Sequence, residues 1–318
     1  MSDNDLTRVA GGRWVAPEEP EIDRPARRKP RPVPPPRKQS YEGNIEVQRW
    51  LIDQALTEGR KEPFRPTFLA GRRDADWILS SLSHFYEQDL IVDIDQEIKS
   101  GKEATVFRCA ADPTTGERYM AAKVYRPRMF RALSNDALYR EGRERRDEHG
   151  KTLRGDRRTP NQRSVQVERW IAYEYETHCI VHAAGVRTPP PFGQVGNALL
   201  MGYVGDEQGP APRLAETRLE PGLAQPMFER LVEDVRLSLM AHRVHGDLSA
   251  YNILVWGDEA LLIDFAQAVD PRQSEGAFDL LLRDLERICA AFAPYGVRAA
   301  PRELADTLWA EYRGSAII

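Results

Sequence analysis

Apolar and polar positions along residues 90–125 alternate in a way that predicts three short strands. The runs "LIVDIDQEI", "ATVFRCA" and "RYMAAKVYR" are separated by turns that contain Gly101 and Gly116. Short strands joined by tight, glycine-containing turns are typical of an antiparallel meander. Upstream, "DADWILSSLSHFYEQ" carries large apolar side chains at roughly helical spacing after an acidic start, and this predicts a helix.

Further along, the pattern changes from strands to helices. "SVQVERWIAYEYETHCIVHAAG" predicts a long helix capped by Ser164 and ended by Gly185. After a rigid "TPPPF" connector, the apolar run "NALLMGYVG" predicts another buried strand, and "GLAQPMFERLVEDVRLSLMAHR" predicts a second long helix. Two amphipathic segments follow at about 273–293 and 301–313. A sheet-rich half therefore precedes a helix-rich half, so the predicted fold class is α+β.

The first 43 residues differ in composition from the rest of the chain. They include "RPARRKPRPVPPPRK", which cannot bury enough apolar surface to offset its ordering entropy, so we expect a disordered, basic, Pro-rich tail. Residues 45–60 could form a short helix. Residues 127–163 are densely charged and predict a mobile loop or a frayed helix. The basic tail could contact RNA, acidic proteins or an SH3-like partner, and a solvated, flexible surface explains both basic segments more simply.

Composition narrows the function classes without choosing one. The 318-residue chain has a net charge of −4, which gives no general argument for nucleic-acid or membrane binding. Its three cysteines include no CxxC pair, which suits a reducing compartment better than a disulfide framework or a zinc site. The chain has neither a basic-then-apolar start nor a run approaching ~18 apolar residues. We therefore expect a cytoplasmic protein with no membrane contact.

A lysine in a predicted strand and a glutamate in a predicted helix form the first chemical pair. Lys123 lies within "MAAKVY", and Glu174 lies on the apolar stripe of the long helix. A glutamate on a packed face needs a cation, because burying an unpaired charge is costly. A strand lysine usually faces solvent, but this order matches the Lys–Glu ion pair with which protein kinases hold the nucleotide phosphates.

A second set of polar residues follows in "VHGDLSAYNIL". Its spacing is His245-x-Asp247-x₄-Asn252, and Asp264 comes twelve residues later at the end of a predicted apolar strand. An Asx-rich turn explains Asp247 or Asn252 singly, but it does not explain the whole set in this order. In a phosphotransferase, Asp247 would accept the proton of the attacking hydroxyl. Asn252 and Asp264 would hold Mg²⁺, which prefers oxygen ligands, so Asp264 counts as both a catalytic and a metal residue.

The turn before the second strand is the third chemical feature. "SGKEATVF" has a single glycine and lacks the GxxxxGK[ST] spacing of a Walker A loop. Its backbone amides could still form an anion nest. We therefore count Ser100, Gly101, Lys102 and Glu103 among the predicted ATP-binding residues.

In this order, the blocks resemble the RIO-type atypical serine/threonine protein kinases. The matching blocks are "SGKEATVF", "AAKVYR", "RWIAYEYETHCIVHAAGV", "TPPPF", "LLMGYVGDEQGPAPRL", "HGDLSAYNIL" and "LIDFAQAVD", within roughly residues 75–293. The resemblance implies a two-lobed protein-kinase-like fold with a small antiparallel-sheet N-lobe, a helical C-lobe and a truncated activation segment. The expected division is a tail at 1–43, a helical extension at 44–90, an N-lobe with hinge at 91–205 and a C-lobe at 206–318.

The resemblance also implies a nucleotide site. Met201 would precede the hinge, and backbone groups of Gly202 and Val204 would hold adenine, with Lys123 and Glu174 at the phosphates. ATP and Mg²⁺, with Mn²⁺ as an alternative ion, would be the cofactors, and an unidentified protein would be the substrate. The family further implies an aspartyl-phosphate on Asp264 and ATPase cycling.

Three functions stay open at this point. The first is a serine/threonine protein kinase of RIO type, acting on another protein or on itself. The second is a small-molecule phosphotransferase of the aminoglycoside-kinase type, which shares HGD-x₄-N, although little chain follows Asp264 to build a substrate pocket. The third is an ATPase conformational switch that binds a ribosomal or RNA partner through the basic segments, with strong salt dependence.

Overall fold

The computed structural model describes residues 61–126, 160–220 and 222–315, together with two short paired strands, β1 (Thr7–Arg8) and β2 (Trp14–Val15). The rest of the predicted tail lies outside the described residues. So do the helix predicted at 45–60 and most of the charged segment predicted at 127–163. The described ranges contain every predicted site residue.

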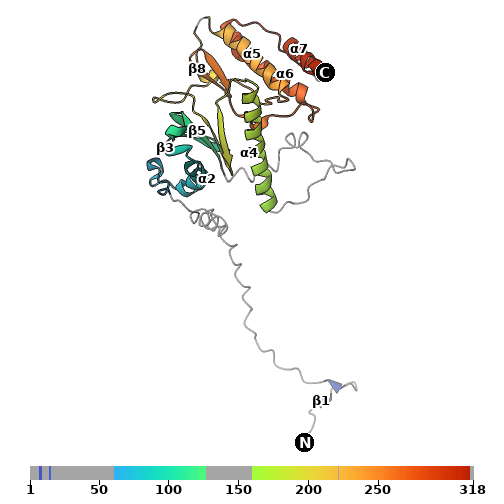
Figure 1. The fold of residues 1–318 in the computed structure, drawn as a ribbon. Helices are drawn as coiled ribbons and strands as arrows, with labels where there is room; N and C mark the ends of the chain where they lie inside the picture. Colours follow the sequence, from blue (N-terminus) through green and yellow to red (C-terminus); the bar gives the residue numbers. More distant parts are fainter. Residues whose placement is uncertain (1–6, 9–13, 16–60, 127–159, 221, 316–318) are drawn as a thin grey trace.

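The first half of that part forms a five-stranded antiparallel sheet (Figure 1). Its strands are β3 (Ile91–Ser100), β4 (Ala104–Ala111), β5 (Tyr119–Tyr125), β6 (Pro191–Val195) and β7 (Ala198–Gly202). Their spatial order is β3-β4-β5-β7-β6, so the predicted meander is confirmed. Part of the predicted "TPPPF" connector belongs to β6, where proline is tolerated because this strand lies at the edge of the sheet.

The two faces of this sheet pack against different parts of the molecule. On one face, Phe107 and Met120 are fully buried against Leu82 and Phe85 of α2 (Ala75–Glu87), the helix predicted upstream of the strands. Side chains alternate between the faces of a strand, so Lys123 lies on the opposite face of β5 from Met120. That opposite face meets the second half of the molecule, and α2 supports the sheet from behind.

The long helix α4 (Pro160–Ala183) connects the two halves (Figure 1). The predicted start at Ser164 is wrong, because the helix begins four residues earlier and Ser164 lies inside it. Proline is favoured at the first helical position, where its missing N–H would have no partner and its φ is already suitable. The predicted end is confirmed by Gly185, which follows the helix with a φ of 87°.

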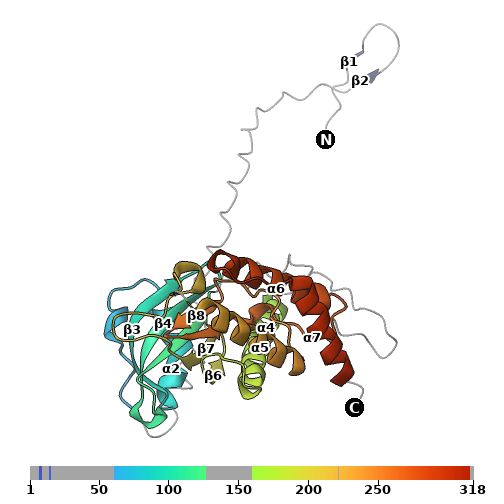
Figure 2. The ribbon, with the colours of Figure 1, turned by 90° about the horizontal axis from the view of Figure 1, so that it is seen from above.

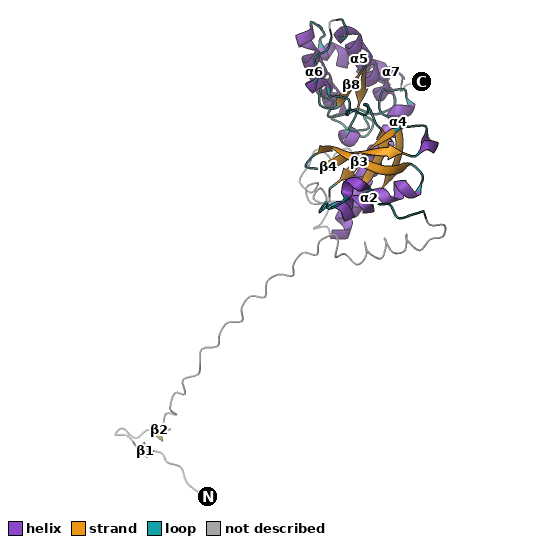
Figure 3. Cartoon of the chain, turned by 90° about the vertical axis from the view of Figure 1, so that its left-hand side faces the viewer, coloured by secondary structure: helices purple, strands orange, loops and turns teal. Residues whose placement is uncertain are grey.

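The second half is mainly helical, as predicted. Its elements are α5 (Ala224–Met240), β8 (Ile253–Trp256), β9 (Glu259–Leu262), α6 (Ala277–Phe292) and α7 (Pro301–Ser315). They share an apolar core that includes Leu231, Leu285 and Phe292. Figures 2 and 3 show this helical half on one side of the sheet, and Figure 3 shows α2 on the other side. Within the described ranges, no helix is both long and apolar enough to span a membrane.

A glycine at the end of β7 allows close contact with Pro190 at the point where the chain passes from the sheet to the helical half. Gly202 pairs with Met120, and its amide donates to the carbonyl of Pro190 at 2.8 Å. A Cβ at position 202 would lie 2.7 Å from the Pro190 ring, so a side chain does not fit without movement of that ring. The segment after Gly202 then turns back on itself, with Gly205 bridged to Pro210.

Asp264 lies beyond the strand end at which the sequence analysis placed it. β9 ends at Leu262, and Asp264 precedes a 3₁₀ helix, Phe265–Gln267. The prediction extended the strand because Ile263 is apolar; in the structure the Ile263 amide donates to the Asn252 carbonyl at 3.0 Å, in register with the Ile253–Leu262 pair, and the hairpin ends there. Asp264 itself has a φ of 70°, in the left-handed region that side-chain-bearing residues rarely occupy.

Candidate active site

The sheet and the helical half meet at Lys123. Its ammonium on β5 donates to Oε1 of Glu174 on α4 at 2.7 Å and to Oδ1 of Asp264 at 2.7 Å. The side chains of Lys123 and Glu174 are 12% and 4% exposed, whereas that of Asp264 is 42% exposed. The structure therefore brings three predicted site residues together from three segments, with one cation between two carboxylates.

Burial and charge act in opposite directions on these three groups. Burial favours the neutral amine of Lys123, but the Asp264 and Glu174 carboxylates outweigh it and hold the pKa of Lys123 well above its ordinary value. Burial raises the pKa of Glu174 against the attraction of Lys123. Burial also opposes ionisation of Asp264, yet Lys123 holds the pKa of that carboxyl below its ordinary value. The lysine is therefore firmly charged, and Asp264 is readily ionised.

Tyr125 completes the buried end of this arrangement. Its hydroxyl donates to Oε2 of Glu174, and its side chain is fully buried. Burial raises the pKa of Tyr125 well above its ordinary value, so the phenol stays a neutral donor. Tyr125 was not among the predicted site residues, although it lies two positions after Lys123 and a strand therefore presents both on one face. With Tyr125 and Lys123, both oxygens of Glu174 have a donor.

Asp247 and Asn252 lie in the loop between α5 and β8. The Asn252 side-chain nitrogen donates to the Asp247 carbonyl oxygen at 2.9 Å and to Oδ2 of Asp247 at 3.3 Å. Oδ1 of Asn252 accepts no hydrogen bond from the residues that the structure describes. The bond from Ile263 to the Asn252 carbonyl holds the Asp264 segment beside this loop. An amide oxygen and a partly exposed carboxylate are hard oxygen donors, so the predicted metal residues fit Mg²⁺.

A buried carboxylate that the sequence analysis missed holds the backbone around Asp247. Asp284 of α6 accepts hydrogen bonds from the amides of Gly246 at 2.7 Å and Leu248 at 2.9 Å, and it is 1% exposed. Burial raises the pKa of Asp284, and the two amides oppose that shift. The available signal was an aspartate on the apolar stripe of the amphipathic segment predicted at 273–293. Asp284 therefore fixes the loop from both sides of Asp247.

Three rings in contact connect the segments that carry the site, with Phe265 stacked on His178 and tilted against His245. The ring centroid of Phe265, the residue after Asp264, lies 5.1 Å from that of His245 and 5.5 Å from that of His178. His178 lies one turn after Glu174 on α4, and its Nε2 is 2.7 Å from the Pro189 carbonyl oxygen. Burial lowers the pKa of His178 to about 4, so the ring is neutral near pH 7.

The predicted phosphate loop is a tight turn between β3 and β4. The amide of Gly101 donates to the Ala104 carbonyl at 2.9 Å, so it does not point at a ligand in this conformation. The Ser100 hydroxyl accepts a bond from Arg126, while Lys102 and Glu103 are exposed. The turn leads into β4, which pairs with β5. The anion nest stays a prediction.

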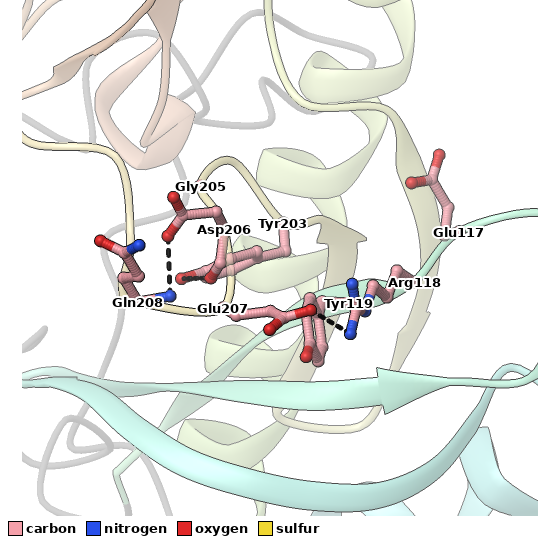
Figure 4. Close-up of a pocket in the computed structure, with 8 residues that line it drawn as sticks. All are labelled: Glu117, Arg118, Tyr119, Tyr203, Gly205, Asp206, Glu207 and Gln208. Atoms are coloured by element: carbon pink, nitrogen blue, oxygen red, sulfur yellow. Dashed lines mark hydrogen bonds and ion pairs between the residues drawn. The ribbon is translucent and has the colours of Figure 1, made fainter.

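The predicted adenine contacts follow Met201: Gly202 is the last residue of β7, and Val204 lies just beyond the strand. The Val204 carbonyl accepts a bond from the Ala211 amide at 2.9 Å, so the amide of Val204 is the group left for a base. Tyr119 shares a face of β5 with Lys123, and its ring centroid lies 5.8 Å from that of Tyr203. These rings border a pocket of about 460 Å³ beside the segment that follows β7 (Figure 4). Its lining residues are Glu117, Arg118, Tyr119, Tyr203, Gly205, Asp206, Glu207 and Gln208.

Comparison with known proteins identifies the family. The RIO domain family matches residues 105–304. The chain belongs to the RIO family. It is 28% identical over 201 residues to the RIO-type serine/threonine-protein kinase Rio1 of Thermoplasma acidophilum, covering 63% of this chain and 97% of that protein. It is 29% identical over 217 residues to the serine/threonine-protein kinase RIO1 of Caenorhabditis elegans, covering 68% of this chain and 40% of that protein.

A solved structure supports the fold independently of sequence. The crystal structure of the Rio2 kinase-ADP/Mg²⁺-phosphoaspartate complex from Chaetomium thermophilum matches with a TM-score of 0.53 and 17% identity, covering 82% of this chain and 74% of that chain. The predicted two-lobed, kinase-like α+β fold is therefore confirmed. The family match likewise confirms the RIO-type resemblance seen in the motif blocks.

Replacing Lys123 with methionine would remove the cation from both carboxylates of this RIO site. We expect the free energy of unfolding to fall by about 3–5 kcal/mol, because Glu174 stays buried without its cation. Denaturant unfolding measures this loss, and adding Glu174→Gln to Lys123→Met should recover much of it. The matched control is Lys61→Met, since Lys61 pairs with Asp89 at the surface and should cost at most about 1 kcal/mol. A Lys123→Met variant as stable as wild type would contradict this account.

His178 should make folding stability depend on pH. Its pKa is about 4 in the folded protein and near 6.5 in the unfolded chain, so the unfolded chain binds the extra proton first as the pH falls. Stability should therefore decline from pH 6.5 towards pH 4, by about 3 kcal/mol from this group. His178→Gln cannot titrate but can still donate to Pro189. Denaturant unfolding between pH 7 and pH 4.5 should show a shallower decline for this variant, and parallel curves would refute the assignment.

Proposed function

We propose that this protein is an ATP- and Mg²⁺-dependent serine/threonine protein kinase, which transfers the γ-phosphoryl group of ATP to a hydroxyl of another protein or of itself. The observation that carries the proposal is the double contact of Lys123 with Glu174 and Asp264 beside the Asp247–Asn252 loop. The names of the Thermoplasma and Caenorhabditis relatives, both serine/threonine protein kinases, support it.

The nucleotide would lie along the face of the sheet that carries Lys123. The lysine would hold the phosphates while Glu174 holds the lysine, because Glu174 is the more deeply buried partner. The amide of Val204 and the carbonyl of Gly202 would hold the adenine edge, with Met201 behind it. The turn at Ser100–Glu103 would cover the phosphates after a change that frees the Gly101 amide. These assignments rest on geometry together with the family resemblance.

Asn252 and Asp264 would hold the metal ion. Their oxygens match the preference of Mg²⁺, which commonly takes one or two protein ligands and completes its shell with phosphates and water. Mn²⁺, which accepts the same oxygen donors, would serve as an alternative ion. When bound, the ion neutralises phosphate charge and orients the phosphoryl group for in-line transfer.

Asp247 would act as the base for the acceptor. Its carboxylate is 47% exposed, so a serine or threonine hydroxyl can reach it. In the transfer, the acceptor oxygen bonds to the γ-phosphorus as the bond between that phosphorus and the β–γ bridging oxygen breaks. The acceptor proton passes to Asp247, and ADP leaves with the bridging oxygen. Catalysis of this kind depends mainly on positioning and charge neutralisation.

A second candidate is ATP hydrolysis through an aspartyl-phosphate on Asp264. The 42% exposure of this carboxylate favours it, since an incoming phosphoryl group can reach the side chain. The solved Rio2 complex carries a phosphoaspartate according to its title. In this reading the protein is a switch that binds a ribosomal or RNA partner. The small-molecule phosphotransferase is less favoured, because the described chain after Asp264 consists mainly of α6 and α7, which pack into the core.

The domain division and the compartment belong to the same proposal. The N-lobe with hinge would span 91–205 and the C-lobe 206–318, preceded by a helical extension at 44–90 and a tail at 1–43. A cytoplasmic location accords with three free cysteines, Cys109, Cys179 and Cys289.

The experiment that tests the function compares wild type with Asp247→Asn in the presence of Mg²⁺ and γ-labelled ATP. We expect acid-stable label on serine or threonine of the protein, reduced by about 10²–10⁴-fold in the variant because the base is lost. Binding of Mg·ADP should change less than twofold. Label found only as free phosphate, or as a hydroxylamine-labile adduct absent from Asp264→Asn, would reject the kinase in favour of the ATPase.

A further inference from the structure

An arginine from α6 contacts the proposed base directly. Nη1 of Arg287 donates to Oδ1 of Asp247 at 2.7 Å, although the two residues lie 40 positions apart in the chain. Their side chains are 40% and 47% exposed. A pair this exposed adds little to folding stability. The contact therefore matters for the chemistry of Asp247 and not for stability.

The position of Arg287 follows from buried contacts of the same helix. Asp284 holds the amides of Gly246 and Leu248, the two residues that flank Asp247. Arg283 donates to the Gly246 carbonyl. Arg287 comes three residues after Asp284, so a helix presents both on the same side. The contact of Arg287 with Asp247 is therefore built on a fixed helix–loop junction and does not depend on two freely moving surface side chains.

The loop itself supplies no cation for Asp247. Its sequence from Asp247 to Asn252 is "DLSAYN", and its side-chain bond to the carboxylate comes from Asn252 at 3.3 Å. Within the described residues, Arg287 is the cation bonded to this carboxylate, and its bond is the shorter one. The two donors approach different oxygens, Oδ1 from Arg287 and Oδ2 from Asn252. Together they fix the plane of the carboxylate.

We propose that Arg287 is a positioning residue for Asp247. A partly exposed aspartate would otherwise rotate, and a base works only when its oxygen is within hydrogen-bond reach of the proton that it takes. The planar guanidinium holds the carboxylate in one orientation, which a flexible point charge does less well. This inference rests on the proposed phosphotransfer, since it assigns Arg287 a part in that reaction.

The test compares the kinetics of Arg287→Met and Arg287→Lys with wild type, using Mg²⁺ and γ-labelled ATP. We expect Arg287→Met to lower kcat by about 10–100-fold, because misplacing a catalytic group costs on that order. The KM for ATP and the Kd for Mg·ADP should stay within twofold, and Arg287→Lys should have an intermediate kcat. Arg302→Met is the matched control, because Arg302 makes an exposed ion pair with Asp306; its kcat should equal that of wild type.

A double-mutant comparison separates positioning from other roles. If Arg287 acts through Asp247, then Arg287→Met should cause no further loss of the residual turnover of Asp247→Asn. If the kcat losses of the two single variants multiply in the double variant, the proposal is overturned. An unchanged kcat in Arg287→Met would overturn it too, as would a fall in kcat that is matched by weaker Mg·ADP binding. These failures leave wild-type transfer intact, whereas a wild type without any transfer would reject the proposed function itself.

Discussion

The ammonium of Lys123 between two carboxylates is the interaction on which the arrangement of this protein depends. Glu174 is almost fully buried, and a carboxylate in that position is tolerated only with a cation and a second donor, which Lys123 and Tyr125 supply. The three residues come from β5 and α4, elements of different packing layers. Satisfying one buried charge therefore fixes the distance between the sheet and the helix that packs on its Lys123 face.

The two carboxylate partners of Lys123 differ in burial. Glu174 is enclosed on all sides, whereas Asp264 is 42% exposed and sits in a left-handed conformation that costs about 1–3 kcal/mol. The surroundings hold it there through the Ile263–Asn252 bond and the contacts of the neighbouring Phe265 ring with His178 and His245. The bond to Glu174 is thus structural, and in the proposed function the bond to Asp264 is the one that a phosphate and a metal ion would replace.

Much of the fold could be predicted from the chain because its signals are local. Alternation of apolar and polar residues predicted the three strands of the meander, and helical spacing predicted α2 and α5. The order of the motifs predicted that one site contains Lys123, Glu174, Asp247, Asn252 and Asp264. The errors also have local causes. Ser164 is a good N-cap residue, but Pro160 begins the helix earlier, and the apolar Ile263 extended a predicted strand past its true end.

Contacts between distant segments could not be predicted in this way. Asp284 and Arg287 lie 36 to 40 residues from the loop that they hold. The apolar stripe marks Asp284 as a packed residue, but nothing in the spacing of "RDLER" shows which loop it meets or that Arg287 reaches the same loop. Tyr125 was closer to prediction, since the strand period places it on the face of Lys123, but its role depends on the depth at which Glu174 is buried.

The measurement that tests the central claim most directly is a crystal structure of the full chain with Mg²⁺ and a non-hydrolysable ATP analogue. We expect Lys123 to keep Glu174 and to exchange Asp264 for phosphate oxygens, with Asp264 and Asn252 on the metal ion. A nucleotide bound elsewhere, with the Lys123–Asp264 bond unchanged, would contradict the account.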